Sequence, residues 1–158
     1  MADPDRSPAR VVAGADVLAA DLLVGGASRE ALDCLRRHSW TTLVASDPLL
    51  ADAEATVAAV ADDALAADWR ERVEAWRERV EHPAGDHPAL ASALHGGAMH
   101  VLSLDGELTG AAGAVAVRDR VETSVRRPDA FARVFDAEGL YRAAVGGEYP
   151  GPDRDPRA

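Results

Sequence analysis

The stretch DHPALASALHGGAMHVLSLD, residues 86–105, reads as one compact helix-to-strand unit. Apolar side chains in residues 90–94 predict a helix, which a pair of glycines closes. The apolar run 98–104 then predicts a buried strand that delivers Asp105 at its end. Asp86 stands just before the helix, so we expect this unit to place two carboxylates on one edge of the fold.

These two acids have two interpretations. Carboxylates gathered at strand ends suggest a divalent-metal site for phosphodiester chemistry. Aspartate is also favoured at helix N-caps and in Asp-Gly turns, so Asp86 could simply cap the helix and Asp105 could simply open a turn. The local sequence favours the cap and the turn, and it leaves the metal site open.

Further strands are expected before this unit. The first ten residues are charged and contain two prolines, which indicates a disordered leader over residues 1–10. Strands are expected at residues 11–16 and 40–45, with a helix over residues 28–37 whose first residue, a serine, is a plausible N-cap. Asp47 can cap the next helix, because a proline then occupies its first turn.

The middle of the chain carries two apolar helical stripes. Apolar residues recur there at spacings of three and four, as on the inner face of a helix. A partner or membrane surface is a possible use of the second stripe, but core packing of its two tryptophans is favoured. The first stripe contains Leu50, Ala53, Val57, Val60 and Ala64, and the second contains Trp69, Val73, Trp76 and Val80.

The pattern after residue 105 completes the expected fold. Residues 107–117 predict a weak helix, 121–125 a strand, and 128–135 a helix with two inward phenylalanines. Alternating strands and helices predict an α/β three-layer sandwich with a mainly parallel central sheet. We expect a single domain over residues 11–145 and an extended or disordered tail over residues 146–158, to which no function is assigned.

Charge and composition limit the partners. The chain has 27 acidic and 17 basic residues, a net charge of -10, and every basic residue is arginine. An acidic surface of this kind is typical of proteins from high-salt cytoplasms. Non-specific duplex binding is not expected, because that affinity comes from clusters of basic residues. A small nucleic-acid site stays open, since metal ions can supply positive charge locally.

Several other classes find no support. The lone Cys34 cannot form an internal disulfide and is expected to be a buried structural thiol. The histidines show no zinc-ligand spacing, and neither a phosphate-binding glycine loop nor a serine-hydrolase elbow is present. No stretch approaches the roughly 18 apolar residues of a membrane helix, so a soluble, cytoplasmic protein without membrane contact is expected.

Four stretches, taken in order, resemble a known family. They are VVAGADVL at residues 11–18, SDPLLAD at 46–52, Asp86 together with Ser-Leu-Asp at 103–105, and TSV followed by PDAF at 123–131. Together they resemble the PIN domain, the metal-dependent ribonuclease fold that includes toxins of the VapC type. The resemblance covers most of residues 11–135.

The resemblance implies a mechanism and a set of site residues. Three or four carboxylates would hold one or two Mg²⁺ or Mn²⁺ ions, and a metal-bound water would attack the phosphodiester of RNA. It implies catalytic roles for Asp16, Asp52, Asp86 and Asp105, of which Asp16, Asp86 and Asp105 would ligate the metal, and it makes Ser103 a supporting hydroxyl. Asp52 could instead be a solvated helix residue. RNA, an antitoxin and a second copy of the chain are the partners implied.

The chain departs from the family pattern at its first acid. Gly14 stands where the first catalytic aspartate is expected, and the acid falls at Asp16. On a strand, Asp16 would face the same side but be displaced by about 6.5 Å, which is large beside a metal–ligand distance of about 2 to 2.6 Å. Asp21 is a second possible substitute. A non-catalytic PIN-like scaffold that binds RNA or protein is therefore the alternative function, and an unrelated α/β domain also stays open.

Overall fold

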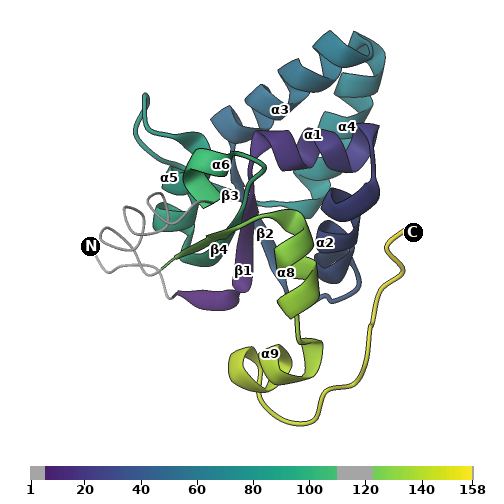
Figure 1. Cartoon of the computed structure of the whole chain (residues 1–158), viewed down its shortest axis with the longest axis vertical. Coiled ribbons are helices and arrows are strands. Elements are labelled where there is room, and N and C mark those ends of the chain that lie inside the picture. The colour runs from purple at the N-terminus through teal and green to yellow at the C-terminus, as the bar shows by residue number, and fades with distance from the viewer. Residues whose placement is uncertain (1–5, 110–122, 158) are drawn as a thin grey trace.

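The computed structural model describes residues 6–109 and 123–157, and these form an α/β fold around a parallel sheet (Figure 1). The sheet has five strands in the order β3-β2-β1-β4-β5, and every neighbouring pair is parallel. The strands are β1 (Ser7–Ala13), β2 (Thr42–Ser46), β3 (Glu78–Val80), β4 (Ala98–Leu102) and β5 (Ser124–Arg126).

Helices cover both faces of this sheet, so the fold is a three-layer sandwich. Helix α5 packs against β1, β2 and β4 on one face, while α2 packs against both α1 and α8 on the other side (Figure 1). The helices are α1 (Ala15–Leu23), α2 (Gly26–Arg36), α3 (Asp47–Val60), α4 (Asp63–Trp76), α5 (Pro88–Gly96), α6 (Gly106–Thr109), α8 (Pro128–Val134) and α9 (Ala137–Ala144). The predicted fold class, with its parallel central sheet, is confirmed.

The strand order has one reversal point. From β1 the chain builds outward to β2 and β3, and it then returns through α5 to add β4 on the other side of β1. The carboxyl ends of β1 and β4 therefore lie side by side, with Ala13 paired to Leu102. In open parallel sheets, the crevice outside the carboxyl ends at such a reversal is where ligands bind.

The core lies where the central strands meet the helices. Val11 and Val12 of β1 and Leu43 and Val44 of β2 are almost completely buried, as is typical of strands covered on both faces. Gly96 permits α5 to approach this closely, because a Cβ on it would lie 2.4 Å from Cγ1 of Val44. A larger residue at this position would push the helix off the sheet.

The middle helices follow the predicted stripes only in part. Leu50, Ala53 and Val57 of the first stripe are buried on α3, whereas Val60 is 68 % exposed and the exposed Ala64 lies on α4. Trp69 and Val73 are buried in the core, and Trp76 packs against it, so the expected core role of this stripe is confirmed. The helix breaks within the first stripe, before Ala64, where Asp62 caps α4 by accepting a hydrogen bond from the Leu65 amide at 2.7 Å. Of the two phenylalanines predicted to point inward, Phe131 is buried and Phe135 packs against the core. Cys34 is half-buried and free.

Several predicted boundaries were wrong. Strand β1 begins at Ser7, so residues 7–10 belong to the sheet and not to a leader, and it ends at Ala13. Helix α2 begins at Gly26, which leaves Ser28 inside the helix instead of at its N-cap. Ser46, and not Asp47, caps α3 through a hydrogen bond from the Leu49 amide.

Other elements were missed or lie outside the described residues. Neither the short strand β3 nor helix α9 was predicted from the sequence. The expected helix at 107–117 falls largely on residues outside the described part of the chain, and only α6 covers its start. The expected strand at 121–125 corresponds to β5 at Ser124–Arg126, and its first two residues lie outside the described part of the chain. None of the helices in residues 6–109 and 123–157 has the length and apolar character that a membrane crossing needs.

The C-terminal tail has no helix or strand, as expected, but it is docked against the domain (Figure 1). The hydroxyl of Tyr149 lies 2.6 Å from Nε2 of His38, and Oδ1 of Asp153 accepts a hydrogen bond from the Ser39 amide at 2.8 Å. Arg157 forms a 2.5 Å ion pair with Asp33 of α2. The tail is therefore part of the folded structure.

Candidate functional site: an acidic pocket and an arginine groove

A pocket of about 180 Å³ opens at the reversal point of the sheet. Its walls come from the residues after β1, the loop after β4 and the first turns of α3 and α5. Four of the five predicted site residues line it. The lining comprises Gly14, Ala15, Asp16, Leu49, Asp52, His87, Pro88, Ala89, Ser103, Asp105 and Leu108. We call it the acidic pocket.

Asp16 reaches this pocket from a helix and not from a strand. It lies in the first turn of α1, where Oδ1 accepts a hydrogen bond from the Val17 amide at 2.8 Å. Its Oδ2 accepts a second bond from the Leu104 amide at 3.0 Å, which ties α1 to the loop after β4. The predicted displacement of about 6.5 Å was based on a strand and is wrong, because the chain turns into the helix after Gly14.

The helical turn brings Asp16 back toward Gly14. A Cβ placed on Gly14 would lie 2.7 Å from Oδ1 of Asp16 and 3.2 Å from the carbonyl oxygen of Leu102. The carboxylate of Asp16 therefore occupies space next to the missing side chain of residue 14. The backbone of Gly14 is extended, with φ at -61° and ψ at 161°, so crowding is the constraint at this position.

The loop after β4 presents Asp105. The amide of Ser103 donates to the carbonyl of Arg126 at 3.0 Å, which continues the pairing of β4 with β5. The buried hydroxyl of Ser103 accepts a bond from the Asp105 amide at 3.0 Å. Oδ1 of Asp105 accepts from the Glu107 amide at 2.9 Å and so also begins the turn into α6. Asp105 therefore both begins a turn, as one interpretation predicted, and lines the pocket, as the other requires.

Asp52 and Asp86 differ in their relation to the pocket. Asp52 lies on α3, lines the pocket, is exposed, and its carboxylate forms no ion pair within the described residues. Asp86 is exposed, precedes α5 and does not line the pocket. The N-cap predicted for Asp86 belongs to His87, whose Nδ1 accepts from the Leu90 amide at 3.4 Å. His87 lines the pocket, and sequence reasoning missed it.

The donor set suits a hard cation, but the ligands do not form a closed cage. Across residues 6–109 and 123–157, no three His, Cys, Asp or Glu side chains come together closely enough to hold a metal ion. Mg²⁺ commonly keeps several waters and contacts only one or two carboxylates. Asp16, Asp52 and Asp105 therefore fit a hydrated divalent cation better than a directly ligated one.

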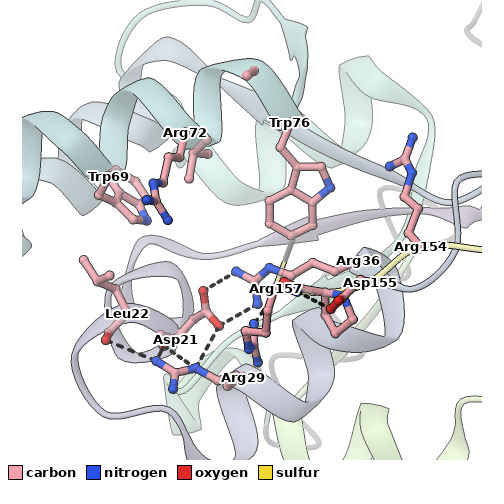
Figure 2. Close-up of a pocket in the computed structure, with 13 residues that line it drawn as sticks. Asp21, Leu22, Arg29, Arg36, Trp69, Arg72, Trp76, Arg154, Asp155 and Arg157 are labelled. Carbon is pink, nitrogen blue, oxygen red and sulfur yellow. Dashed lines mark hydrogen bonds and ion pairs between the residues drawn. The ribbon is translucent and has the colours of Figure 1, made fainter.

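A second cavity, of about 800 Å³, lies between α1, α2, α4 and the C-terminal tail (Figure 2). Sequence reasoning missed it, because its residues are scattered from position 21 to position 157. We call it the arginine groove. It is lined by Asp21, Leu22, Arg29, Arg36, Trp69, Arg72, Val73, Ala75, Trp76, Arg154, Asp155, Pro156 and Arg157.

A chain of ion pairs organises one wall of this groove. Asp21 accepts two hydrogen bonds from Arg36, at 2.9 and 2.5 Å, and Arg36 also pairs with Asp33 at 3.0 Å. Burial works against the charged guanidinium, but these hydrogen bonds and ion pairs raise the pKa of Arg36 above its ordinary value. Arg29 donates to the carbonyl oxygen of Asp21 at 2.6 Å. Asp21, a possible substitute for the first acid, thus serves the arginine groove and not the acidic pocket.

Comparison with known proteins gives one match. No curated protein and no solved structure matches the chain. A family model, described as a family of unknown function, matches residues 5–157. This match covers nearly the whole sequence, so the chain belongs to the family of unknown function DUF7384.

Proposed function

We propose that the protein is a PIN-type, metal-dependent endoribonuclease whose active site is the acidic pocket. The observation that carries the proposal is that Asp16, Asp52 and Asp105, which come from three separate segments, line one pocket at the reversal point of a parallel sheet. Pockets at this point of α/β sheets bind ligands, and acidic ones suit divalent cations.

The chemistry of this pocket follows from its oxygen donors. Asp16, Asp52 and Asp105 would hold a hydrated Mg²⁺ or Mn²⁺, which when bound supplies a water of lowered pKa and positive charge beside the phosphate. The protein itself orients the acids. The Ser103 hydroxyl holds the Asp105 amide, and Asp16 holds the Leu104 amide, so both acids depend on the same short loop.

Cleavage of a single-stranded RNA pool with Mn²⁺ in molar KCl tests the proposal. Asp105→Asn removes an acid of the pocket and keeps the size of the side chain, so we expect it to reduce cleavage to background. Asp86→Asn makes the same chemical change two residues before α5, outside the pocket, and we expect it to cleave like the wild type. Equal cleavage by all three proteins would indicate a contaminating nuclease and overturn the proposal.

A non-catalytic scaffold is the second candidate function. It is favoured by the engagement of Asp16, because both carboxylate oxygens already accept backbone hydrogen bonds. A cation would have to compete with these bonds or bind through water. Calorimetric titration with Mn²⁺ separates the two functions. A nuclease should bind Mn²⁺ and lose this binding in Asp105→Asn, whereas a scaffold should show no Mn²⁺ binding that depends on Asp105.

A further inference from the structure

The arginine groove contrasts with the charge of the rest of the chain. The whole protein has a net charge of -10, yet the groove is lined by five arginines and only two acids. At long range such a protein repels polyanions, so an anionic ligand needs cations gathered in one place. The groove supplies this local concentration on a face formed by α1, α2, α4 and the tail.

Two of these arginines are available for a ligand. The side chains of Arg72 and Arg154 form no hydrogen bond and no salt bridge with any described residue, and both are exposed. Hydrogen bonds from Ser39 are the main cause that lowers the pKa of the neighbouring Asp153, and the charge of Arg154 adds only a small contribution. Figure 2 shows Arg72 on α4 and Arg154 on the tail, on either side of Trp76.

Arg36 and Arg157 are held in place by buried acids before any ligand binds. Asp21 is only 6 % exposed and Asp33 only 7 % exposed, and both accept hydrogen bonds from Arg36, which bridges them. Arg157 extends this chain by pairing with Asp33. Because buried acids hold these guanidinium groups, the wall needs no ligand to form. Each guanidinium has five N–H donors, so donors remain for a second partner.

The groove also offers aromatic surface. Trp76 is half-buried, and the guanidinium carbon of Arg36 lies 4.8 Å from the centre of its ring. Trp69 is buried beneath and forms part of the wall. Grooves that bind single-stranded nucleic acid combine cations for the backbone with aromatic side chains for the bases. Planar guanidinium groups match the oxygens of a phosphate particularly well.

We propose that the arginine groove binds the phosphodiester backbone of single-stranded RNA, at a site distinct from the acidic pocket. This inference rests on the proposed function, which supplies RNA as the ligand. Helix α1 connects the two cavities, because Asp16 lines the acidic pocket and Asp21 lines the groove. The step of five residues from Asp16 to Asp21 corresponds to about 7.5 Å along the helix axis and about 140° around it, so the two cavities lie at different sides of the same helix.

Fluorescence anisotropy of a labelled oligouridylate tests this binding site directly. EDTA prevents cleavage, so binding is measured apart from catalysis. Arg72→Gln and Arg154→Gln each remove a cation without breaking an ion pair. Arg133→Gln is the control for the loss of one exposed arginine outside the groove, because Arg133 is 77 % exposed on α8 and its substitution breaks only a 3.5 Å surface pair with Asp129. Circular dichroism checks that each variant is folded.

We expect Arg72→Gln and Arg154→Gln each to weaken binding by about tenfold. Each should also reduce the slope of log affinity against log salt concentration by about 0.7, the share of one phosphate contact on a single strand. Arg133→Gln should bind like the wild type. Equal affinity of the wild type and both groove variants would overturn the proposal.

Two competitors test whether the ligand is an RNA strand. The results of this binding test can also be told apart from those of the cleavage test. Uridine monophosphate or polyglutamate that displaces the oligonucleotide at equal concentration would overturn the assignment to an RNA strand. If cleavage depends on Asp105 but binding ignores Arg72 and Arg154, only the groove proposal fails. If the groove variants weaken binding but Asp105→Asn changes nothing, the nuclease proposal fails and the groove still stands.

Discussion

Oδ1 of Asp16 lies 2.7 Å from the point at which a side chain on Gly14 would begin. The resemblance to PIN domains places an acid at residue 14, whereas this chain has glycine there and an acid two positions later. Because α1 starts between them, the carboxylate of Asp16 turns back toward Gly14 instead of continuing along a strand. The two residues are thus linked sterically, and the glycine leaves room for the acid.

This relationship predicts a cost for any side chain at position 14. In Gly14→Ala the new methyl group would crowd Asp16 and the carbonyl oxygen of Leu102, which is 3.2 Å away. Overpacking of this kind typically costs about 1 to 3 kcal/mol. Urea unfolding should show this loss of stability in Gly14→Ala. In Asp16→Ala the contact is absent, so adding Gly14→Ala to that variant should cost clearly less.

Gly106→Ala is the control for the same change. No atom lies within 4 Å of a Cβ on Gly106, at the first position of α6. This variant should be as stable as the wild type or slightly more stable, because alanine favours a helix. Additive effects of Gly14→Ala and Asp16→Ala would show that the two residues are not coupled.

Divalent cations should stabilise the protein through the acidic pocket. Negative charges gathered in one pocket repel one another until a cation neutralises them. We expect millimolar Mn²⁺ to raise the melting temperature relative to EDTA at constant ionic strength. Asp105→Asn should reduce that increase, whereas Asp86→Asn, outside the pocket, should keep it. An equal increase in all three proteins would mean that the cation acts elsewhere.

The fold class was predictable from the apolar periodicity of the sequence, whereas the arrangement of the candidate site was predictable only in part. Alternating apolar runs and helical stripes indicate a parallel α/β sheet whatever the details of the loops. Asp105 was found because it follows a buried strand, and strand ends of a parallel sheet share an edge. The groove of Arg36, Arg72 and Arg154 could not be found, because its parts meet only when the tail docks on α2.

Boundary errors have a specific physical cause in this chain. Asp16 was placed on a strand because the apolar run from Val11 continues past it in the sequence. The strand ends where Gly14 hydrogen-bonds to the Leu102 carbonyl at 2.8 Å, and a helix begins at once. Apolar periodicity over a few residues does not distinguish these two states. The position of the acid therefore depended on a contact with β4, far away in the sequence.

Acid stability should depend on Asp47. Hydrogen bonds from Arg79 and Arg77 lower the pKa of Asp47 from 3.8 to about 2. A carboxyl whose pKa is lowered by folding stabilises the protein above its unfolded pKa, and this contribution disappears as the pH falls from about 4 to about 2. Asp47 is 45 % exposed, so solvent screening limits the contribution to under about 1 kcal/mol.

Asp47→Asn should therefore flatten the decline in stability across this pH range, relative to the wild type. Asp129→Asn is the matched control, because Asp129 is similarly exposed and its ion pairs with Arg127 and Arg133 are longer, at 3.6 and 3.5 Å. Urea unfolding at several pH values between 2 and 5 measures the difference. Identical pH profiles for both variants would exclude a special role for Asp47.

The docked tail should contribute to stability through Tyr149. Nδ1 of the buried His38 lies 2.7 Å from the carbonyl oxygen of Cys34, which requires the proton on Nδ1. In the neutral ring Nε2 is then an acceptor, and it receives the hydroxyl of Tyr149 at 2.6 Å. Tyr149→Phe leaves this nitrogen unpaired, at a cost of about 1 kcal/mol.

Limited proteolysis of the tail should detect the same change. In Tyr149→Phe the protease should cut within the tail faster than in the wild type, because the tail detaches from the domain more often. Tyr141→Phe is the control, since Tyr141 contacts the rings of Trp40 and Tyr149 but its hydroxyl makes no hydrogen bond with a described residue. Equal cleavage rates for both variants and the wild type would show that the hydroxyl of Tyr149 does not hold the tail.

Salt should stabilise the protein as a whole. With a net charge of -10, the folded chain brings excess negative charge together, and screening reduces the resulting repulsion. The screening length falls from about 10 Å at 0.1 M salt to about 3 Å at 1 M, so the melting temperature should rise over this range. KCl and tetramethylammonium chloride should act alike if screening is the cause. A melting temperature that stays constant from dilute buffer to molar salt would contradict this, and it would mean that the acidic surface is spaced widely enough for its charges not to interact.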